Sequence, residues 1–199
     1  MIQIAITGGI ACGKSLAGEL FAAAGWAVCE TDHVAHSLYA PGGPGFEPVC
    51  ALFGADILQS DGHIDRTKLG QAVFSNPERL QALNAVLHPL VKDHVATWLE
   101  DERRKGAKGA AVIVPLLFEA GMETGWDAIV CIGCSRDIQQ KRLLERGLTE
   151  SDIAARVAAQ MPIEEKMKRA DYQVWNNGDR ASFAAAINHV VDKVSERKN

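Results

Sequence analysis

A glycine-rich stretch near the N-terminus constrains the fold of this chain more than any other feature. Residues 4–22 read IAITGGIACGKSLAGELFA, so an apolar run ends at two glycines, and a lysine and a serine follow. Gly8, four intervening residues and then Gly13-Lys14-Ser15 satisfy G-x-x-x-x-G-K-[ST], the pattern of a phosphate-binding loop. Successive backbone N–H groups of such a loop converge on one phosphate. The pattern therefore predicts a site for a nucleoside triphosphate.

The segments on either side of this loop have the periodicity that the motif requires. Before the loop, Ile2, Ile4 and Ile6 are β-branched and apolar, which is typical of a short buried strand. After the loop, apolar residues recur at helical spacing from Leu16 to Ala24. A strand, a tight turn and a helix together aim the backbone N–H groups at an anion. The alternative, a glycine-rich turn whose lysine has no ligand, is the less favoured interpretation.

Four further apolar segments alternate with helical patterns along the chain. These predicted strands are residues 26–31 (WAVCET), 110–117 (AAVIVPLL), 127–134 (DAIVCIGC) and 171–178 (DYQVWNNG). Strands that alternate with helices favour a parallel sheet that is covered on both faces. With the strand before the loop, the sequence predicts an α/β fold with five parallel strands.

A long insertion separates the second and third predicted strands. It has about 80 residues, which is too long for a plain crossover, so it must form helices of its own. The run Ser75-Asn76-Pro77-Glu78 predicts a helix start, with a Ser–Glu capping box and proline at the first position. Apolar residues then recur at helical spacing to Leu99, and Pro89 is expected to kink or divide that helix. We expect this insertion to bind the acceptor of the phosphate.

Composition argues against several classes of protein. The chain has 21 basic and 25 acidic residues in 199, a net charge of -4, whereas nucleic-acid-binding surfaces usually show a basic excess. No apolar run approaches the roughly 20 residues of a membrane span. The first residues lead directly into a strand, without the basic and apolar regions of a targeting peptide. We therefore expect a cytoplasmic protein that binds small molecules and has no nucleic-acid, membrane or obligate protein partner.

The five cysteines, at positions 12, 29, 50, 131 and 134, lie in apolar company. Cys131 and Cys134 have the C-x-x-C spacing, but they fall in a predicted strand, where residues three apart point to opposite faces. A redox or zinc site needs that spacing on a turn, with partners. The cysteines are therefore expected to be reduced packing residues, and Cys12, inside the phosphate loop, to be sensitive to alkylation without being catalytic.

The rest of the sequence narrows the class of phosphate-loop protein. The D-x-x-G and N-K-x-D patterns of signalling GTPases do not occur, and the length is too short for a motor or transport ATPase. A small kinase remains, which needs a group that orients or deprotonates the acceptor. Asp32 directly follows the second predicted strand, at the carboxyl edge where ligands bind in open α/β sheets. Its position alone fits two roles equally, a general base or the N-cap of the next helix.

Six motifs, in order along the chain, resemble those of the dephospho-CoA kinase family. They are TGGIACGKS (7–15), ETDHVAH (30–36), LHPLV (87–91), VPLLFE (114–119), SRDIQQKRLLER (135–146) and RADYQVWNNG (169–178). The phosphate loop is shared by many families, whereas the ordered set of the later motifs is much more specific. The resemblance implies ATP-dependent phosphorylation of the ribose 3′-hydroxyl of dephospho-CoA, the last step of coenzyme A synthesis.

The resemblance also implies a single P-loop kinase-like domain in three parts. The nucleotide-binding core is expected at about 1–31, 108–134 and 170–199, the helical acceptor-binding insertion at about 32–107, and a helical lid at about 135–169. The sequence departs from the family pattern at Glu30 and, within the loop, at Ala11, Cys12 and Leu16. Position 11 is usually glycine, and glycine there can serve a backbone with positive φ.

Residue roles follow from the motifs. Lys14, Arg142 and Asp32 are expected to be catalytic, Ser15 to hold Mg²⁺, and Asp32, His88 and Lys92 to bind the acceptor. The residues expected at the ATP site are Gly9, Ile10, Ala11, Cys12, Gly13, Lys14, Ser15, Leu16, Arg142, Arg146 and Asn177.

Simpler roles stay open for several of these residues. Arg142 and Arg146, four apart, either reach a phosphate together or form a solvated helix face. His88 either binds the acceptor or packs at the proline that follows it. Lys92 contacts a pyrophosphate or water, and Asn177 contacts adenine or lies in a plain turn.

Two other functions of the protein also stay open. One is another small kinase of the nucleoside monophosphate or shikimate type, and the other is a nucleotide-binding regulatory module without transfer activity.

Overall fold

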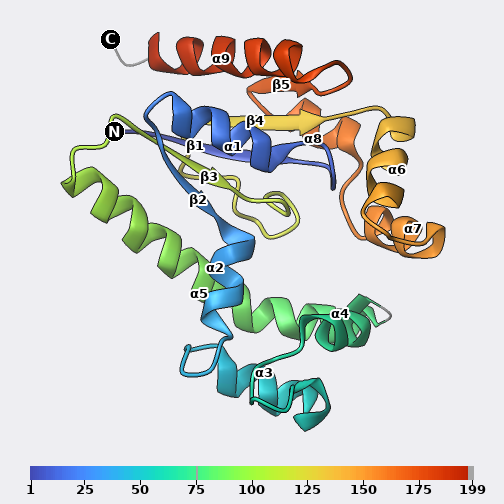
Figure 1. The fold of residues 1–199 in the computed structure, drawn as a ribbon. Helices are drawn as coiled ribbons and strands as arrows, with labels where there is room; N and C mark the ends of the chain where they lie inside the picture. Colours follow the sequence, from blue (N-terminus) through green and yellow to red (C-terminus); the bar gives the residue numbers. More distant parts are fainter. Residues whose placement is uncertain (75, 197–199) are drawn as a thin grey trace. The chain divides into compact units, whose positions relative to one another are not determined.

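Five parallel strands form the sheet of the computed structural model, which describes residues 1–74 and 76–196 (Figure 1). The strands are β1 (Ile2–Gly8), β2 (Ala27–Glu30), β3 (Gly109–Ile113), β4 (Ala128–Gly133) and β5 (Tyr172–Trp175). They lie side by side in the order β2-β3-β1-β4-β5, and every neighbouring pair is parallel. The predicted α/β class and five-stranded parallel sheet are confirmed.

Helices occupy most of the remaining described chain. They are α1 (Lys14–Ala23), α2 (Thr31–Leu38), α3 (Phe46–Phe53), α4 (Arg66–Phe74), α5 (Pro77–Arg104), α6 (Arg136–Glu145), α7 (Glu150–Ala158), α8 (Ile163–Arg169) and α9 (Arg180–Glu196), with a 3₁₀ turn at Ala55–Ile57. In the described residues, no helix combines the length and the apolar composition needed to cross a membrane.

The chain divides into two compact units. The first, called the core unit below, consists of Met1–Glu30 and the chain from Leu99 onward, and it contains the whole sheet. The second, called the insertion unit, is Thr31–Trp98 and is helical. Each unit has a hydrophobic cluster of its own, described next.

In the core unit, helices cover both faces of the sheet. Because side chains alternate along a strand, Ile4 and Ile6 of β1 point to one face, where they join Phe21 of α1 and Phe183 of α9 in the main hydrophobic cluster. The opposite face packs against α8. There a Cβ added to Gly133 of β4 would lie 2.5 Å from a side-chain atom of Met167, so glycine allows this close approach. The alternation fits a parallel sheet buried on both faces.

The insertion unit is held by a separate apolar cluster. Val49 of α3 is fully buried there, and Leu83 and Leu87 of α5 contribute one helical face. Leu69 of α4 and Ile57 of the 3₁₀ turn complete the centre of this cluster. Leu83 and Leu87 are four residues apart, which is the spacing that places them one above the other on α5.

The long helix α5 differs from the sequence-based expectation at Pro89. The helix runs from Pro77 to Arg104 without a break, so of the two outcomes expected at Pro89, a kink or a division, the division is wrong. A proline removes only one hydrogen bond of the ladder. The apolar stripe of Leu83, Leu87 and Val91 continues on both sides of the proline, and its burial favours one helix.

The start of α5 is capped, although the predicted capping box includes Ser75, which lies outside the described residues. The side-chain oxygen of Asn76 accepts hydrogen bonds from the backbone N–H groups of Glu78 and Arg79, at 3.0 and 3.1 Å. Asn76 therefore performs the cap, and Pro77 takes the first helical position as predicted.

Strand β3 is shorter than predicted. It ends at Ile113, although the apolar run continues to Leu117. The backbone N–H of Val114 still donates to Ile6, at 2.8 Å, but Pro115 has no N–H group to extend the ladder. The chain then leaves the sheet, so the end of the apolar run forms a buried turn rather than a strand.

The segment from Ser135 to Arg169 is helical, as expected, and is interrupted after α6 and again after α7. α6 ends at Glu145, Gly147 has a φ of 80°, and Thr149 caps α7. Thr149 and Asp152 form a full capping box, in which each side chain accepts from the backbone N–H of the other residue.

Candidate active site

The phosphate loop joins β1 to α1, and two of its glycines are required by the geometry. A Cβ on Gly8 would lie 1.9 Å from the carbonyl oxygen of Ile132 in β4, and Gly8 also has a φ of 142°. A Cβ on Gly13 would lie 2.4 Å from Nδ2 of Asn176, and Gly13 has a φ of 107°. At Gly8 a side chain would require the backbone of β4 to move, and at Gly13 it would displace the side chain of Asn176 and strain the backbone.

Lys14, the first residue of α1, lies against the loop that precedes it. Its Nζ donates hydrogen bonds to the carbonyl oxygens of Gly8 and Gly9, at 3.2 and 2.8 Å. The ammonium group is thus held close to the turn whose pattern predicts a phosphate. The N-terminus of α1 adds the partial positive charge of unpaired N–H groups.

Ala11 has the strained backbone that the sequence indicated. It is the one residue other than glycine reported with a positive φ among the described residues, at 58°. An L-residue in this left-handed region costs roughly 1–2 kcal/mol. The methyl group of Ala11 packs with Leu143 of α6 and Ile153 of α7, and this burial offsets part of that cost.

Arg142 of α6 connects the phosphate loop to the segment that follows β5. One guanidinium nitrogen donates to the carbonyl oxygen of Ala11, at 3.2 Å, and another donates to that of Asn176, at 3.3 Å. Arg142 is half-buried and bonded to two carbonyl groups, which argues against the alternative of a solvated helix face for this residue. Arg146 is exposed and lies just beyond the end of α6, as its C-cap. The two arginines therefore have different environments.

Three amide side chains form hydrogen bonds with the backbone of the loop, and the sequence analysis missed most of them. Asn176, buried after β5, donates to the carbonyl oxygen of Cys12, at 2.9 Å. Gln139 of α6 donates to the carbonyl oxygen of Ile10, at 2.9 Å, and Gln160 accepts from the Ile10 N–H, at 3.2 Å. No local pattern marks these amides, because their partners are far away in sequence.

Asn177, expected at the ATP site, uses its side-chain oxygen within the protein. That oxygen accepts a hydrogen bond from the backbone N–H of Ser135, at 2.7 Å, directly before α6 begins. Asn177 is exposed, and its amide therefore positions the start of α6. Contact between Asn177 and a nucleotide stays a prediction.

Two thiols meet beside the loop. The sulfur atoms of Cys12 and Cys134 are 3.2 Å apart, and both side chains are buried. The hydrogen bond with Cys134 lowers the pKa of the Cys12 thiol to about 7, and the positive charges of Lys14 and Arg142 act in the same direction against the effect of burial. The same hydrogen bond and burial raise the pKa of Cys134.

A cavity of about 730 Å³ opens beside the loop within the core unit. Gly9, Cys134 and Gln139 line it on the loop side, and Ile163 and Trp175 are among the apolar residues of the remaining wall. The cavity therefore places a thiol of the pair next to a space large enough for a small molecule.

A buried ion pair holds the turn after β3 against α8. Nζ of Lys166, whose side chain is fully buried, lies 2.8 Å from a carboxylate oxygen of Glu119 and donates to the carbonyl oxygen of Pro115, also at 2.8 Å. The same Glu119 oxygen accepts the N–H of Met161, at 2.8 Å. The VPLLFE motif therefore has a structural role, because its carboxylate anchors the segment that leads into α8.

The expected acceptor-binding residues lie in the insertion unit. Asp32 is exposed and is the second residue of α2, so it lies inside the helix rather than at the N-cap. His88 and Lys92 are one turn apart on α5, half-buried and exposed respectively. Burial lowers the pKa of His88, and the positive charge of Lys92 adds to this effect.

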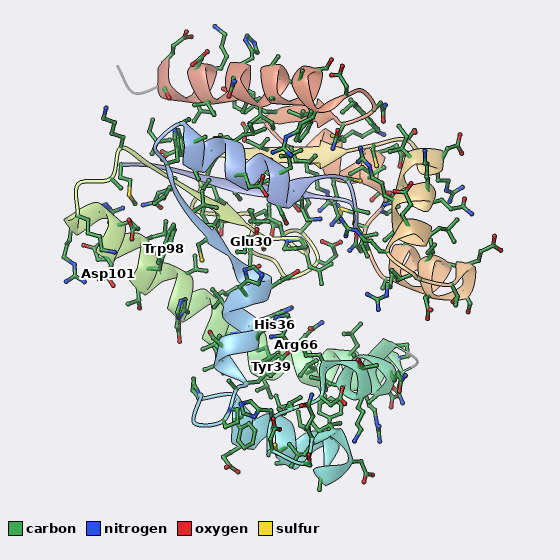
Figure 2. The ribbon with its side chains drawn as sticks, viewed as in Figure 1. Glu30, His36, Tyr39, Arg66, Trp98 and Asp101 are labelled. Atoms are coloured by element: carbon green, nitrogen blue, oxygen red, sulfur yellow. The ribbon has the colours of Figure 1, made fainter. Side chains whose placement is uncertain are left out.

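The insertion unit also contains a polar cluster that the sequence analysis did not identify. His36 and Tyr39 of α2 meet edge to face, with ring centroids 5.6 Å apart, and Arg66 begins α4 beside them (Figure 2). Nδ1 of His36 is buried without a hydrogen-bond partner. Burial lowers the pKa of His36, and the charge of Arg66 lowers it further. Both effects favour the neutral imidazole of His36.

The comparisons with known proteins agree with one another. The family model described as dephospho-CoA kinase matches residues 2–182. A dephospho-CoA kinase of Geobacillus kaustophilus is 42% identical over 180 residues, which cover 90% of this chain and 90% of that protein. A solved structure from Thermus thermophilus has a TM-score of 0.80 at 33% identity and covers 96% of this chain and 97% of its own. A solved dephospho-CoA kinase from Campylobacter jejuni has a TM-score of 0.69 at 26% identity, with 99% and 98% covered.

Proposed function

The chain belongs to the dephospho-CoA kinase family, and we propose how its own residues carry out the ATP-dependent phosphorylation of the ribose 3′-hydroxyl of dephospho-CoA. The protein is an enzyme, a phosphotransferase of the last step of coenzyme A biosynthesis. The roles proposed below concern the nucleotide, the acceptor and the metal ion.

The observation that best supports the nucleotide site is the pair of cations on one loop. Lys14 bonds to the carbonyls of Gly8 and Gly9, and Arg142 bonds to the carbonyl of Ala11. Phosphoryl transfer depends mainly on positioning and on neutralising negative charge. Two cations fixed on the phosphate loop supply both, so we assign Lys14 to the β- and γ-phosphates and Arg142 to the charge that develops during transfer.

The nucleotide-side assignment includes the loop and its flanks. The loop from Gly9 to Leu16 surrounds the phosphates, with Arg146 and Asn177 at the outer part of the nucleotide. Arg146 suits this role because it is exposed at the end of α6, where its side chain can reach a ligand.

Ser15 is the residue proposed to hold Mg²⁺. The part of the chain that the structure describes contains no group of three or more His, Cys, Asp or Glu residues that could bind a metal on its own. Mg²⁺ commonly takes few protein ligands and keeps waters and substrate phosphates, which fits one exposed hydroxyl at the start of α1. When bound, the ion neutralises phosphate charge.

Asp32 is proposed to accept the proton of the acceptor hydroxyl. Its carboxylate is exposed, and its place inside α2 supports this role over that of an N-cap. A general base needs an accessible carboxylate that can hydrogen-bond to the hydroxyl it deprotonates. His88 and Lys92 are proposed to bind the acceptor, Lys92 through its charge and His88 as a neutral group.

We further propose the cytoplasm as the location of the protein. All five cysteines are free thiols, and free thiols are typical of reducing compartments.

The test is a transfer assay on the purified protein with Mg²⁺ and ATP. Dephospho-CoA is compared with shikimate and a panel of nucleoside monophosphates, and ADP release is followed together with the mass of the product. We expect a phosphorylated product from dephospho-CoA alone. Transfer to another acceptor but not to dephospho-CoA would overturn the proposal, and binding of ATP without any transfer would favour a regulatory module.

A further inference from the structure

Cys12 and Cys134 bring two parts of the core unit together. Cys12 lies in the phosphate loop, between β1 and α1, and Cys134 directly follows β4. β1 and β4 are neighbours in the sheet, with Gly8 opposite Ile132, so the residues just beyond these strands also meet. The two sulfur atoms are 3.2 Å apart, and both thiols are free. A disulfide between them needs a separation of about 2.05 Å, so a shift of about 1.2 Å closes the bond.

The surroundings make this pair reactive. The hydrogen bond with Cys134 lowers the pKa of the Cys12 thiol most. The positive charges of Lys14 and Arg142 lower it further. The lowered pKa favours a thiolate at this pair, whereas an ordinary cysteine is mostly protonated at neutral pH. Elsewhere, burial raises the pKa of Cys29 to about 11 and that of Cys131 to about 12, which keeps those thiols protonated.

The pair lies beside the cavity, where a small reagent can approach Cys134. Cys134 is part of its wall, and the cavity volume of about 730 Å³ greatly exceeds that of a peroxide molecule. Gly9 lies in the same wall, so the open space extends to the phosphate loop itself.

We propose that Cys12 and Cys134 form a modification site, at which a peroxide oxidises the two thiols to a disulfide that lowers the affinity of the loop for nucleotide. This proposal goes beyond the transfer reaction and does not depend on the identity of the acceptor.

The chemistry balances in two steps. The thiolate attacks one oxygen of hydrogen peroxide, the O–O bond breaks, and a sulfenic acid and hydroxide form. The sulfur of the second cysteine then attacks the sulfenic sulfur, an S–S bond forms, the S–O bond breaks, and water leaves. Hydroxide takes up one proton from the solvent. Two sulfur atoms are oxidised, and one peroxide is reduced to two water molecules.

The bond would act on nucleotide binding because Cys12 belongs to the loop backbone. The carbonyl groups of Ala11 and Cys12 are fixed by Arg142 and Asn176, so the loop has little freedom to absorb a shift of its cysteine. A movement of the order of 1 Å is enough to misplace donors that must meet a phosphate. We expect at least a tenfold loss of ATP affinity.

The experiment compares reduced protein with protein treated with hydrogen peroxide. Peptide mass spectrometry under non-reducing conditions is expected to find the peptides of Cys12 and Cys134 joined, with the mass of two hydrogen atoms lost. Calorimetric titration with ATP is expected to show at least a tenfold weaker affinity, restored by dithiothreitol. Saturating ATP during the treatment is expected to slow the reaction, because phosphate charge disfavours the thiolate.

Two variants make the result specific. Cys134→Ser keeps the size of the side chain but cannot form the bond, so its ATP affinity is expected to withstand peroxide. Cys50→Ser removes a thiol of the insertion unit and is expected to respond as the unmodified protein does. Absence of the joined peptides, or a joined protein with unchanged ATP affinity, would overturn the proposal. Equal loss of affinity in Cys134→Ser would do so as well.

Discussion

The core unit and the insertion unit hold their expected functional residues in different ways. In the core unit, Arg142 bonds to a carbonyl 131 residues away and Asn176 to one 164 residues away, so distant segments fix the phosphate loop. In the insertion unit, Lys68 bonds to the carbonyl of Leu58, ten residues away, and Ser37 to that of Val34, three away. The difference indicates that the residues proposed for the nucleotide are held by long-range contacts, whereas those proposed for the acceptor include exposed groups such as Asp32.

The largest expected effect is on kcat, and it comes from a change in the insertion unit. Asp32→Asn keeps the shape of the side chain but replaces one carboxylate oxygen with an NH₂ donor, so the side chain cannot take up a proton. If the carboxylate is the general base, kcat falls by roughly 10²–10⁴-fold. Because Asp32 is exposed, the unfolding temperature should change little. Steady-state kinetics and thermal unfolding check both expectations, and a variant with normal kcat would remove the base from the account.

A difference in stability should separate the two units. Lys166→Met leaves the Glu119 carboxylate without its buried partner, and loss of one member of such a pair costs about 3 kcal/mol, the lower end of the range because Glu119 is partly exposed. That corresponds to a fall of roughly 6–12 °C in the unfolding temperature. Lys68→Met is the matched change in the insertion unit, where the lysine is exposed, and should cost less than about 1 kcal/mol. Equal costs in denaturant titrations would contradict the comparison.

Arg142 tests whether the loop depends on its distant partners. Arg142→Ala removes two bonds to carbonyl groups, those of Ala11 and Asn176, and should lower stability by about 1–3 kcal/mol. It should also lower kcat/KM at least about tenfold, since one stabilising charge is lost. Arg146→Ala, at an exposed position, is the control and should leave stability within about 0.5 kcal/mol. If Arg142→Ala unfolds at the same denaturant concentration as the parent, the loop does not need this bridge.

The smallest expected effect concerns Ala11. Glycine removes the cost of the positive φ but also removes a buried methyl group, worth about 0.8 kcal/mol, and adds freedom to the unfolded chain. These effects nearly cancel, so Ala11→Gly should change the free energy of unfolding by less than about 1 kcal/mol. A gain above about 2 kcal/mol would mean that the packing against Leu143 and Ile153 contributes little.

The sequence predicted the sheet well because each strand is a short apolar run bounded by turn residues. The cap at Thr149 and the positive φ at residue 11 were also predictable, because both depend on local backbone geometry. The continuity of α5 through Pro89 was not, since the burial of an apolar stripe outweighs one missing hydrogen bond.

The site was predictable only where its chemistry is local. Lys14 belongs to a contiguous motif, whereas Gln139, Gln160 and Asn176 carry no pattern and become meaningful only through tertiary contacts. The sequence grouped Cys134 with Cys131 by spacing. The structure pairs Cys134 with Cys12, because β1 and β4 are neighbours in the sheet. The boundaries of core, insertion and lid stay predictions.

The central claim is that the core unit alone supplies the nucleotide site. The most direct test is the ATP affinity, measured by calorimetry without an acceptor. Lys14→Ala should weaken binding at least tenfold, because it removes a charge from the phosphate loop. Asp32→Asn should bind ATP within about twofold of the parent protein, because the carboxylate belongs to the acceptor side. Equal weakening in both variants, or normal binding by Lys14→Ala, would contradict the account.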